Sequence, residues 1–233
     1  MNIAKFLFIR VFTVMILILN MSGCGKGTEP EKKPEYEIGW KQDLDSSTTF
    51  RNNWEVKGKP GTPAADFHIV KTDSGGYLNM KSDKASASVV TRVEVDDPSA
   101  LPVLRWRWRA KELPDGADAR LADKDDQAIG IYIGTGSMLS KKAVAYHWDT
   151  ETPAGTEGKS TYGLGTIKVK WITLRNRNAP MDTWLTEERN FIQDFKEAWG
   201  FVPENIYISV SCNSQYTGTL AEADLDWIGL SDR

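Results

Sequence analysis

Val103-Leu-Arg-Trp-Arg-Trp-Arg-Ala110 alternates apolar and cationic side chains through its six central residues. In a β-strand, successive side chains point to opposite faces. One face would therefore carry Leu104, Trp106 and Trp108, and the other Arg105, Arg107 and Arg109. We expect a half-buried strand whose tryptophans lie in a core and whose arginines lie outside it.

Short segments of similar character are spread along the rest of the chain. They are residues 77–80, 88–95, 127–133, 143–148, 166–174, 205–212 and 223–230. Clusters of Gly, Pro and Asp separate them, such as Asp73-Ser-Gly-Gly76 and Pro114-Asp-Gly116, and these residues favour turns. The pattern predicts an all-β fold, an antiparallel β-sandwich or jelly roll like those of lectins and carbohydrate-binding modules.

One segment, residues 186–199, departs from the period of two. A spacing of four, which is that of one helix face, relates Phe191, Phe195 and Trp199. Glu187 and Glu188 would stand in the first turn of this helix, and Gly200 would follow as its C-cap. We expect one α-helix that covers the sandwich.

The composition argues against several classes of function. Of the 233 residues, 40% are hydrophobic and 26% are charged, which is the balance of a folded globular domain. The 29 Lys and Arg against 32 Asp and Glu give a net charge of −3, whereas a nucleic-acid partner requires a clustered positive excess. No CxxC, HExxH, GxSxG, P-loop or GxGxxG motif is present, so the common zinc, acyl-transfer and nucleotide-binding classes are not indicated.

The N-terminus predicts export and attachment to a membrane. Lys5 and Arg10 precede an apolar run over residues 11–19, which is typical of a signal peptide and too short for a stable membrane anchor. Met21-Ser-Gly-Cys24 resembles the bacterial lipobox, in which the cysteine is lipidated and becomes the mature N-terminus. Alternatively, the segment is an ordinary signal peptide and Cys24 is incidental.

We therefore expect three parts: a lipoprotein signal peptide over residues 1–23, a lipidated Cys24 with a flexible tether over residues 24–37, and a single β-sandwich domain over residues 38–233. Cys212 is the only other cysteine, so no disulfide within the chain is expected. Removal of Lys5 and Arg10 would leave 27 basic and 32 acidic side chains, a charge of −5. The expected location is the bacterial cell envelope, anchored in a membrane.

Alternation sorts the side chains of the remaining strands as well. The bulkier apolar set should face the core, because burial of one such side chain is worth about 1.5–3 kcal/mol. The expected core positions are Trp106, Trp108, Ile129, Ile131, Ile133, Val144, Tyr146, Trp148, Ile167, Val169, Trp171, Ile206, Ile208 and Val210. The opposite positions are Arg105, Arg107, Arg109, Asp126, Tyr132, His147, Asp149, Lys168, Lys170, Tyr207, Ser209, Ser211 and Asn213.

The second set has five cations and two anions, a local charge of +3, together with tyrosines and one histidine. If it lined one hollow, it would suit an acidic glycan, because arginine binds carboxylates through two parallel hydrogen bonds and tyrosine offers a flat ring with a polar tip. The expected ligand-binding residues are Arg105, Arg107, Arg109, Asp126, Tyr132, His147 and Lys170. Alternatively, these residues only form a solvated sheet face.

Three functions remain open at this point. The preferred hypothesis is a non-catalytic carbohydrate-binding lipoprotein. An enzyme is the second: in a jelly-roll polysaccharide lyase, Arg107 would neutralise a uronate carboxylate, while Tyr132 and His147, oriented by Asp149, would transfer protons. The third is an envelope scaffold that binds protein.

No metal or cofactor is assigned, although two acidic groups suggest a structural calcium ion, which prefers oxygen ligands. One is the run Asp123-Lys-Asp-Asp126. The other joins Asp224 and Asp226 of the last strand to Asp43 and Asp45 near the first. The first lacks the spacing of a calcium loop, so a solvated turn explains it better, and the second is a weak pattern that ordinary acids at strand edges also explain.

Residues 103–230 also resemble DUF3047, a bacterial family of unknown function. The matching motifs are Leu104-Arg-Trp-Arg-Trp108, Asp125-Asp126, Tyr146-His-Trp148, Trp184-Leu-Thr-Glu-Glu-Arg-Asn190, Asp194-Phe-Lys-Glu-Ala-Trp-Gly200 and Thr217-Gly218. The resemblance implies a sandwich fold and an exported bacterial protein, and it brings no known activity. It also implies an ion-pair network at the helix start among Asp125, Asp126, Glu188, Arg189 and Asp194.

Overall fold

A computed structural model of the protein describes residues 36–37, 54–73, 75–137 and 140–233. These belong to the unit Lys33–Arg233, whereas the unit Met1–Lys32 lies outside the described residues. The signal peptide, Cys24, the tether up to residue 35, Asp43 and Asp45 lie outside them too.

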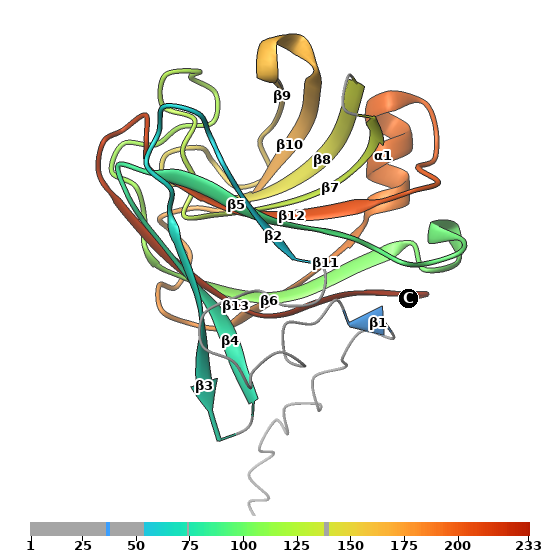
Figure 1. The fold of residues 1–233 in the computed structure, drawn as a ribbon, viewed down its shortest axis with the longest axis horizontal. Coiled ribbons are helices and arrows are strands. Elements are labelled where there is room, and N and C mark those ends of the chain that lie inside the picture. The colour runs from blue at the N-terminus through green and yellow to red at the C-terminus, as the bar shows by residue number, and fades with distance from the viewer. Residues whose placement is uncertain (1–35, 38–53, 74, 138–139) are drawn as a thin grey trace, which may run out of the picture. The chain divides into compact units, whose positions relative to one another are not determined.

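The described residues form two β-sheets (Figure 1). The six-stranded sheet has the order β11–β6–β13–β4–β3, and β1 also pairs with β13. Its strands are β1 (Tyr36–Glu37), β3 (Asp66–Thr72), β4 (Gly75–Asp83), β6 (Val103–Glu112), β11 (Leu185–Asn190) and β13 (Leu220–Ser231). The seven-stranded sheet has the order β2–β5–β12–β7–β8–β10–β9. Its strands are β2 (Glu55–Gly58), β5 (Ser86–Arg92), β7 (Ile129–Ser137), β8 (Ser140–Trp148), β9 (Glu157–Tyr162), β10 (Ile167–Arg175) and β12 (Tyr207–Asn213).

Aromatic side chains join the two sheets across one hydrophobic core. Trp106 of β6 stacks on Tyr146 of β8 with ring centroids 5.2 Å apart, and Trp108 of β6 meets Trp148 of β8 edge-on at 5.6 Å. All four side chains are buried completely. The predicted β-sandwich is therefore confirmed, with the tryptophans of β6 at its centre.

One part of the face sorting is wrong. Ile167, Val169 and Trp171 lie on the opposite side of the seven-stranded sheet, where Val169 and Trp171 align with Ala143 and Ala145 of β8. Lys170 aligns with Val144 and so faces the core side. The rule assumed that the larger side chains of a strand face the sandwich core, but a loop buries those of β10 from the other side.

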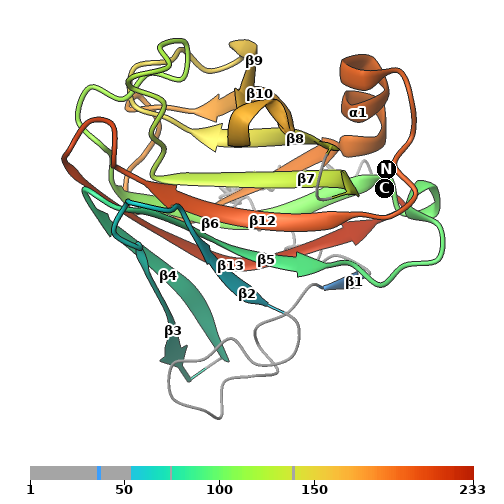
Figure 2. The same cartoon turned by 45° about the horizontal axis from the view of Figure 1, so that its top comes forward.

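The sheets are not purely antiparallel, because β8 and β10 pair in parallel. After β8, the chain forms β9 at the edge of the sheet and returns through Gly163–Gly165, a short 3₁₀ turn, so that β10 enters between β8 and β9. Figure 2 shows β9 and β10 at the end of the curved seven-stranded sheet, away from the six-stranded one.

The helix is shorter than expected. Helix α1 covers Phe191–Trp199 only, and residues 186–190 belong to β11. The Asn190 side chain accepts a hydrogen bond from the Gln193 amide as its N-cap, and Gly200 ends it with φ of 79°. Glu187 and Glu188 align with Trp106 and Arg105 of β6, so strand pairing overrides the helical signal.

Phe191 and Phe195 are buried, and α1 packs mainly on β8, which confirms the covering helix. In the part of the chain that the structure describes, no helix has the length and apolar character needed to cross a membrane.

Candidate functional site

The arginines of β6 lie on the side of the six-stranded sheet that faces away from the core, and each of them pairs with a carboxylate there. Arg105 pairs with Glu188 at 3.2 Å, Arg107 with Asp226 at 3.0 Å, and Arg109 with Asp224 at 2.6 Å. Lys111 continues the series with Glu222. The expected positive surface is thus neutralised by acids from β11 and β13, and Asp224 and Asp226 serve as arginine partners.

The remaining predicted site residues lie elsewhere, so the expectation of one hollow is wrong. Tyr132 of β7 and His147 of β8 face outward from the seven-stranded sheet. Lys170 faces a cavity of about 260 Å³ between β9, β10 and α1, where it pairs with Glu157 at 2.5 Å. Asp126 precedes β7 and accepts hydrogen bonds from the amides of Tyr216 and Thr217. The sheet order separates the arginines from Tyr132 and His147.

The ion-pair network that the resemblance implied is present only in pieces. Arg189 binds Asp194 through two hydrogen bonds, and the Tyr146 hydroxyl donates to the same carboxylate at 2.7 Å. Glu188 belongs to the Arg105 pair, while Asp125 and Asp126 lie at the other sheet.

We call the side of the seven-stranded sheet that faces away from the core the outer face. The charged Glu55, Lys57 and Arg92 lie at its β2–β5 edge. The rest of its open half includes Ser88, Val90, Tyr132, Tyr207, Ser209 and Asn213. All six side chains retain contact with solvent, and Tyr207 is 41% exposed. Apart from the two rings and Val90, these are groups that can donate and accept hydrogen bonds.

The Tyr132 ring comes close to the sheet because position 130 is glycine. A Cβ atom at Gly130 would come within 2.8 Å of Tyr132 Cε2 and 3.0 Å of Ser211 Oγ. Any larger residue would therefore push the ring away from the sheet. Glycine in a strand interior gives no side-chain packing of its own, and here it makes room for the close approach of a ring.

The other half of the outer face is covered, and it holds Trp171, His147 and Thr173. Trp171 lies over Gly158 in the same way, since a Cβ there would come within 2.1 Å of the indole. The His147 ring lies between Tyr132, at 5.6 Å, and Trp171, at 6.3 Å and nearly parallel. Thr173 aligns with His147 on the neighbouring strand.

His147 is completely buried, which lowers its pKa to about 3 and keeps the imidazole neutral. Neither ring nitrogen has a hydrogen-bond partner among the described residues. Asp149 does not orient it as expected, because this carboxylate accepts from the Ala119 amide and the Thr152 hydroxyl. A ligand on the surface would not reach the imidazole, so this arrangement does not support a general base.

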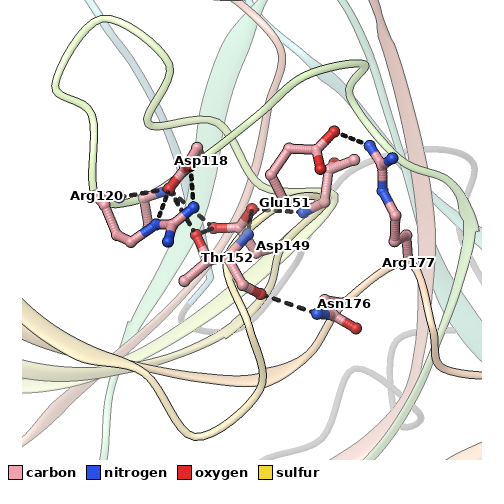
Figure 3. A network of polar contacts seen from close by, with 9 residues as sticks. Asp118, Arg120, Asp149, Glu151, Thr152, Asn176 and Arg177 are labelled. Carbon is pink, nitrogen blue, oxygen red and sulfur yellow. Dashed lines mark hydrogen bonds and ion pairs between the residues drawn. The ribbon is translucent and has the colours of Figure 1, made fainter.

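We call residues 113–128 the cover loop, because Ala119 packs with Trp171 over the covered half. Figure 3 shows its anchor, in which Asp118 binds Arg120 and Thr152, and Thr152 binds Asp149. The Arg120 guanidinium lowers the pKa of Asp118 to about 2, whereas burial raises the pKa of Asp149 to about 6.

A second contact holds the other end of the cover loop. The Tyr162 hydroxyl of β9 donates to Asp125 at 2.5 Å, and the Gln127 amide donates to the same carboxylate at 2.6 Å. Burial raises the pKa of Asp125. Among the described residues, no group of three or more His, Cys, Asp or Glu side chains is arranged to hold a metal ion.

The family model for proteins of unknown function named DUF3047 matches residues 52–229. The chain belongs to the DUF3047 family. No curated protein sequence matches this DUF3047 chain.

Several solved structures share its general architecture. They include a thermostable cellulase derived from that of Rhodothermus marinus, with 12% identity over 77% of this chain and 92% of the other and a TM-score of 0.46. A family 11 carbohydrate-binding module of Clostridium thermocellum, in complex with a mixed-linked β-1,3-1,4 tetrasaccharide, has 12% identity over 84% and 94% and a TM-score of 0.43. A xyloglucanase domain of a Sinorhizobium fredii effector, in complex with cellobiose, has 12% identity over 80% and 100% and a TM-score of 0.47. Similarities this weak carry no functional assignment.

The close approach of Tyr132 to the sheet predicts the effect of Gly130→Ala. We expect the free energy of unfolding to fall by about 1–3 kcal/mol, because the added methyl group displaces the ring. Urea denaturation measures this change. Gly58→Ala on β2 is the control, since a Cβ there would have no neighbour within 4 Å. In a Tyr132→Ala background the cost should shrink, and an undiminished cost would show that the ring is not what glycine accommodates.

Burial of His147 predicts a pH dependence. The unfolded chain binds a proton on histidine below about pH 6.5, whereas the folded chain does so only near pH 3. Stability therefore falls as the pH falls between these values. Relative to His147→Leu, the wild type should lose about 2 kcal/mol of unfolding free energy between pH 7 and pH 5. Asp149 titrates in both proteins, so its contribution cancels in the comparison. A difference in unfolding free energy that does not change with pH would contradict the buried, neutral histidine.

Proposed function

We propose that this DUF3047 chain is a non-catalytic glycan-binding protein and that the open half of the outer face binds an uncharged polysaccharide. The position of Tyr132 carries the proposal: its ring lies against the sheet over Gly130, and it remains partly exposed. The Ser209 hydroxyl aligns with it on β12, and Ser88 and Asn213 lie farther along the same face.

This combination suits the two sides of a sugar. A pyranose ring has an apolar C–H face, which packs on a flat aromatic ring, and equatorial hydroxyl groups, which both donate and accept hydrogen bonds. Ser and Asn side chains can both donate and accept hydrogen bonds. The tyrosine ring offers a flat apolar surface, and it loses little conformational entropy on binding. Tyr207, on the neighbouring β12, offers a second exposed ring for a longer chain.

The surroundings favour binding without chemistry. Hydrolysis of a glycoside requires two carboxyl groups that face the same bond. Close to the outer face, Asp125 already binds Tyr162 and Gln127, Asp126 holds the 216–217 backbone, and Asp149 holds the cover loop. The lyase hypothesis needed Arg107 beside Tyr132 and His147, and Arg107 lies in the other sheet.

The charges favour an uncharged ligand over the acidic glycan first considered. The arginines that would have bound uronate carboxylates lie in the six-stranded sheet, with a carboxylate beside each. Lys170 is paired with Glu157 on the α1 side of its sheet. On the open half of the outer face, the side chains nearest Tyr132 are uncharged. The charged Glu55, Lys57 and Arg92 lie at the β2–β5 edge, where Lys57 pairs with Glu55 and Arg92 with Glu94.

The binding proposal predicts that Tyr132→Ala lowers the affinity for polysaccharide at least tenfold, or about 1.4 kcal/mol. Affinity electrophoresis of the full chain in detergent, in gels containing mixed-linkage β-glucan, xyloglucan or polygalacturonate, measures the retardation. Arg107→Ala is the control, and its retardation should equal that of the wild type.

Retardation of the wild type by none of these polymers would overturn the proposal. So would retardation that survives Tyr132→Ala and disappears in Arg107→Ala. A rise in ultraviolet absorbance on incubation with polygalacturonate would show lyase chemistry and contradict the non-catalytic assignment.

The location remains part of the proposal. The lipobox-like Met21-Ser-Gly-Cys24 supports attachment of the mature chain to a membrane of the bacterial envelope through acyl groups on Cys24.

We expect Cys24→Ser to abolish incorporation of radiolabelled palmitate and to move the protein out of the membrane fraction. Cys212→Ser is the matched control, because this thiol is buried in the sandwich and should leave labelling unchanged. Equal labelling of the Cys24→Ser variant and the wild type would contradict the lipid anchor.

A further inference from the structure

The covered half of the outer face has the same ingredients as the open half. Trp171 approaches Gly158 closely, as Tyr132 approaches Gly130. Beside the indole, the aligned His147 and Thr173 present three polar atoms: both imidazole nitrogens and the threonine Oγ1. The two halves are continuous, because His147 lies between the rings of Tyr132 and Trp171.

The burial of these polar atoms without hydrogen-bond partners destabilises the fold. His147 and Thr173 are fully buried, and none of the three atoms has a hydrogen-bond partner among the described residues. A buried polar group without a partner costs about 1–3 kcal/mol. The core of the sandwich does not require them, since both residues face away from it. A ligand hydroxyl group that entered here would find both donors and acceptors.

What separates this half from solvent is the cover loop. Ala119 packs on the Trp171 side. The loop is held by the Asp149–Thr152 anchor, by the hydrogen bond from Tyr162 to Asp125, and by bonds to the 216–217 backbone and to Asn213 near its C-terminal end. Residues 120–124, between these contacts, are exposed. The Tyr162–Asp125 contact is a single side-chain bond, and its release would free the loop from β9 while the other attachments persist.

We propose that Trp171, His147 and Thr173 form a second, recessed sugar subsite, and that a glycan chain bound at Tyr132 extends into it when the Tyr162–Asp125 contact opens. This inference rests on the proposed function, because it extends the same surface. Trp171 supplies the stacking plane, and the Thr173 hydroxyl and the His147 nitrogens exchange hydrogen bonds with the sugar hydroxyls.

Thr173→Val tests the subsite, since it removes the hydroxyl and keeps the shape of the side chain. The probes are the disaccharide and hexasaccharide of the polysaccharide that retards the chain, cellobiose and cellohexaose for a β-1,4-glucan. Calorimetry and NMR titration of the full chain in detergent should show an affinity for the hexasaccharide at least fivefold weaker and an unchanged affinity for the disaccharide. Thr161→Val on β9, an exposed position facing the other way, is the control and should change neither.

Tyr162→Phe tests the opening, because it removes only the hydroxyl that binds Asp125. Hydrogen exchange over residues 113–128 should become faster, and association with the hexasaccharide should accelerate at least threefold. Unchanged exchange and association rates would overturn the role of this contact.

The outcomes separate the two proposals. If Tyr132→Ala weakens binding while Thr173→Val leaves the hexasaccharide affinity unchanged, the recessed subsite is wrong and the proposed function stands. An equal loss for both oligosaccharides in Thr173→Val would likewise overturn the subsite, since it indicates a general disturbance. If Tyr132→Ala has no effect on binding, the proposed function is wrong, and the subsite that rests on it is wrong too.

Discussion

The packing of Trp106 and Trp108 against Tyr146 and Trp148 determines which side of each sheet faces the core. The rings of β6 and β8 pack between the layers and are wholly buried, so neither strand can shift its register by one residue without exposing them. The alternate positions must then point outward, which places Arg105, Arg107 and Arg109 outside one sheet and His147 outside the other. The two outward sets belong to different sheets, so they do not share a hollow.

The same sidedness explains why the arginines do not form a binding surface. Alternation within β6 can be seen in eight residues, and the structure confirms it. The carboxylates that neutralise the arginines come from β13 and β11, and Asp226 lies 119 residues from Arg107 in the chain. Strand order decides which distant acids arrive beside β6, and local periodicity contains no information about strand order. The early start expected for the helix fails for a related reason, because Glu187 and Glu188 have neighbours in β6 that outweigh their preference for a first helical turn.

Part of the candidate site could be found from the sequence. Tyr132, Ser209 and Asn213 were assigned correctly to a face opposite the core, because their strands have clear apolar partners. Trp171 was not, since its size assigned it to the core, whereas a second apolar cluster with Ala119 buries it on the outer side. The available signal was the pairing of a large ring with a glycine: Gly130 and Tyr132 along one strand, and Gly158 and Trp171 across two. The second pair becomes visible only when the register is known.

Those glycines let the two rings come close to the sheet, but they do not determine how exposed the rings are. A tyrosine or tryptophan on a sheet ordinarily stands out from it, and its face is then shared with cross-strand neighbours. Over a glycine, the ring can come closer to the backbone, and its other side faces away from the sheet. At Tyr132 that side remains partly open, whereas at Trp171 the cover loop closes it. The number of aromatic rings that the outer face presents therefore depends on the loop rather than on the sheet. Three buried carboxylates, Asp125, Asp126 and Asp149, help to hold the loop.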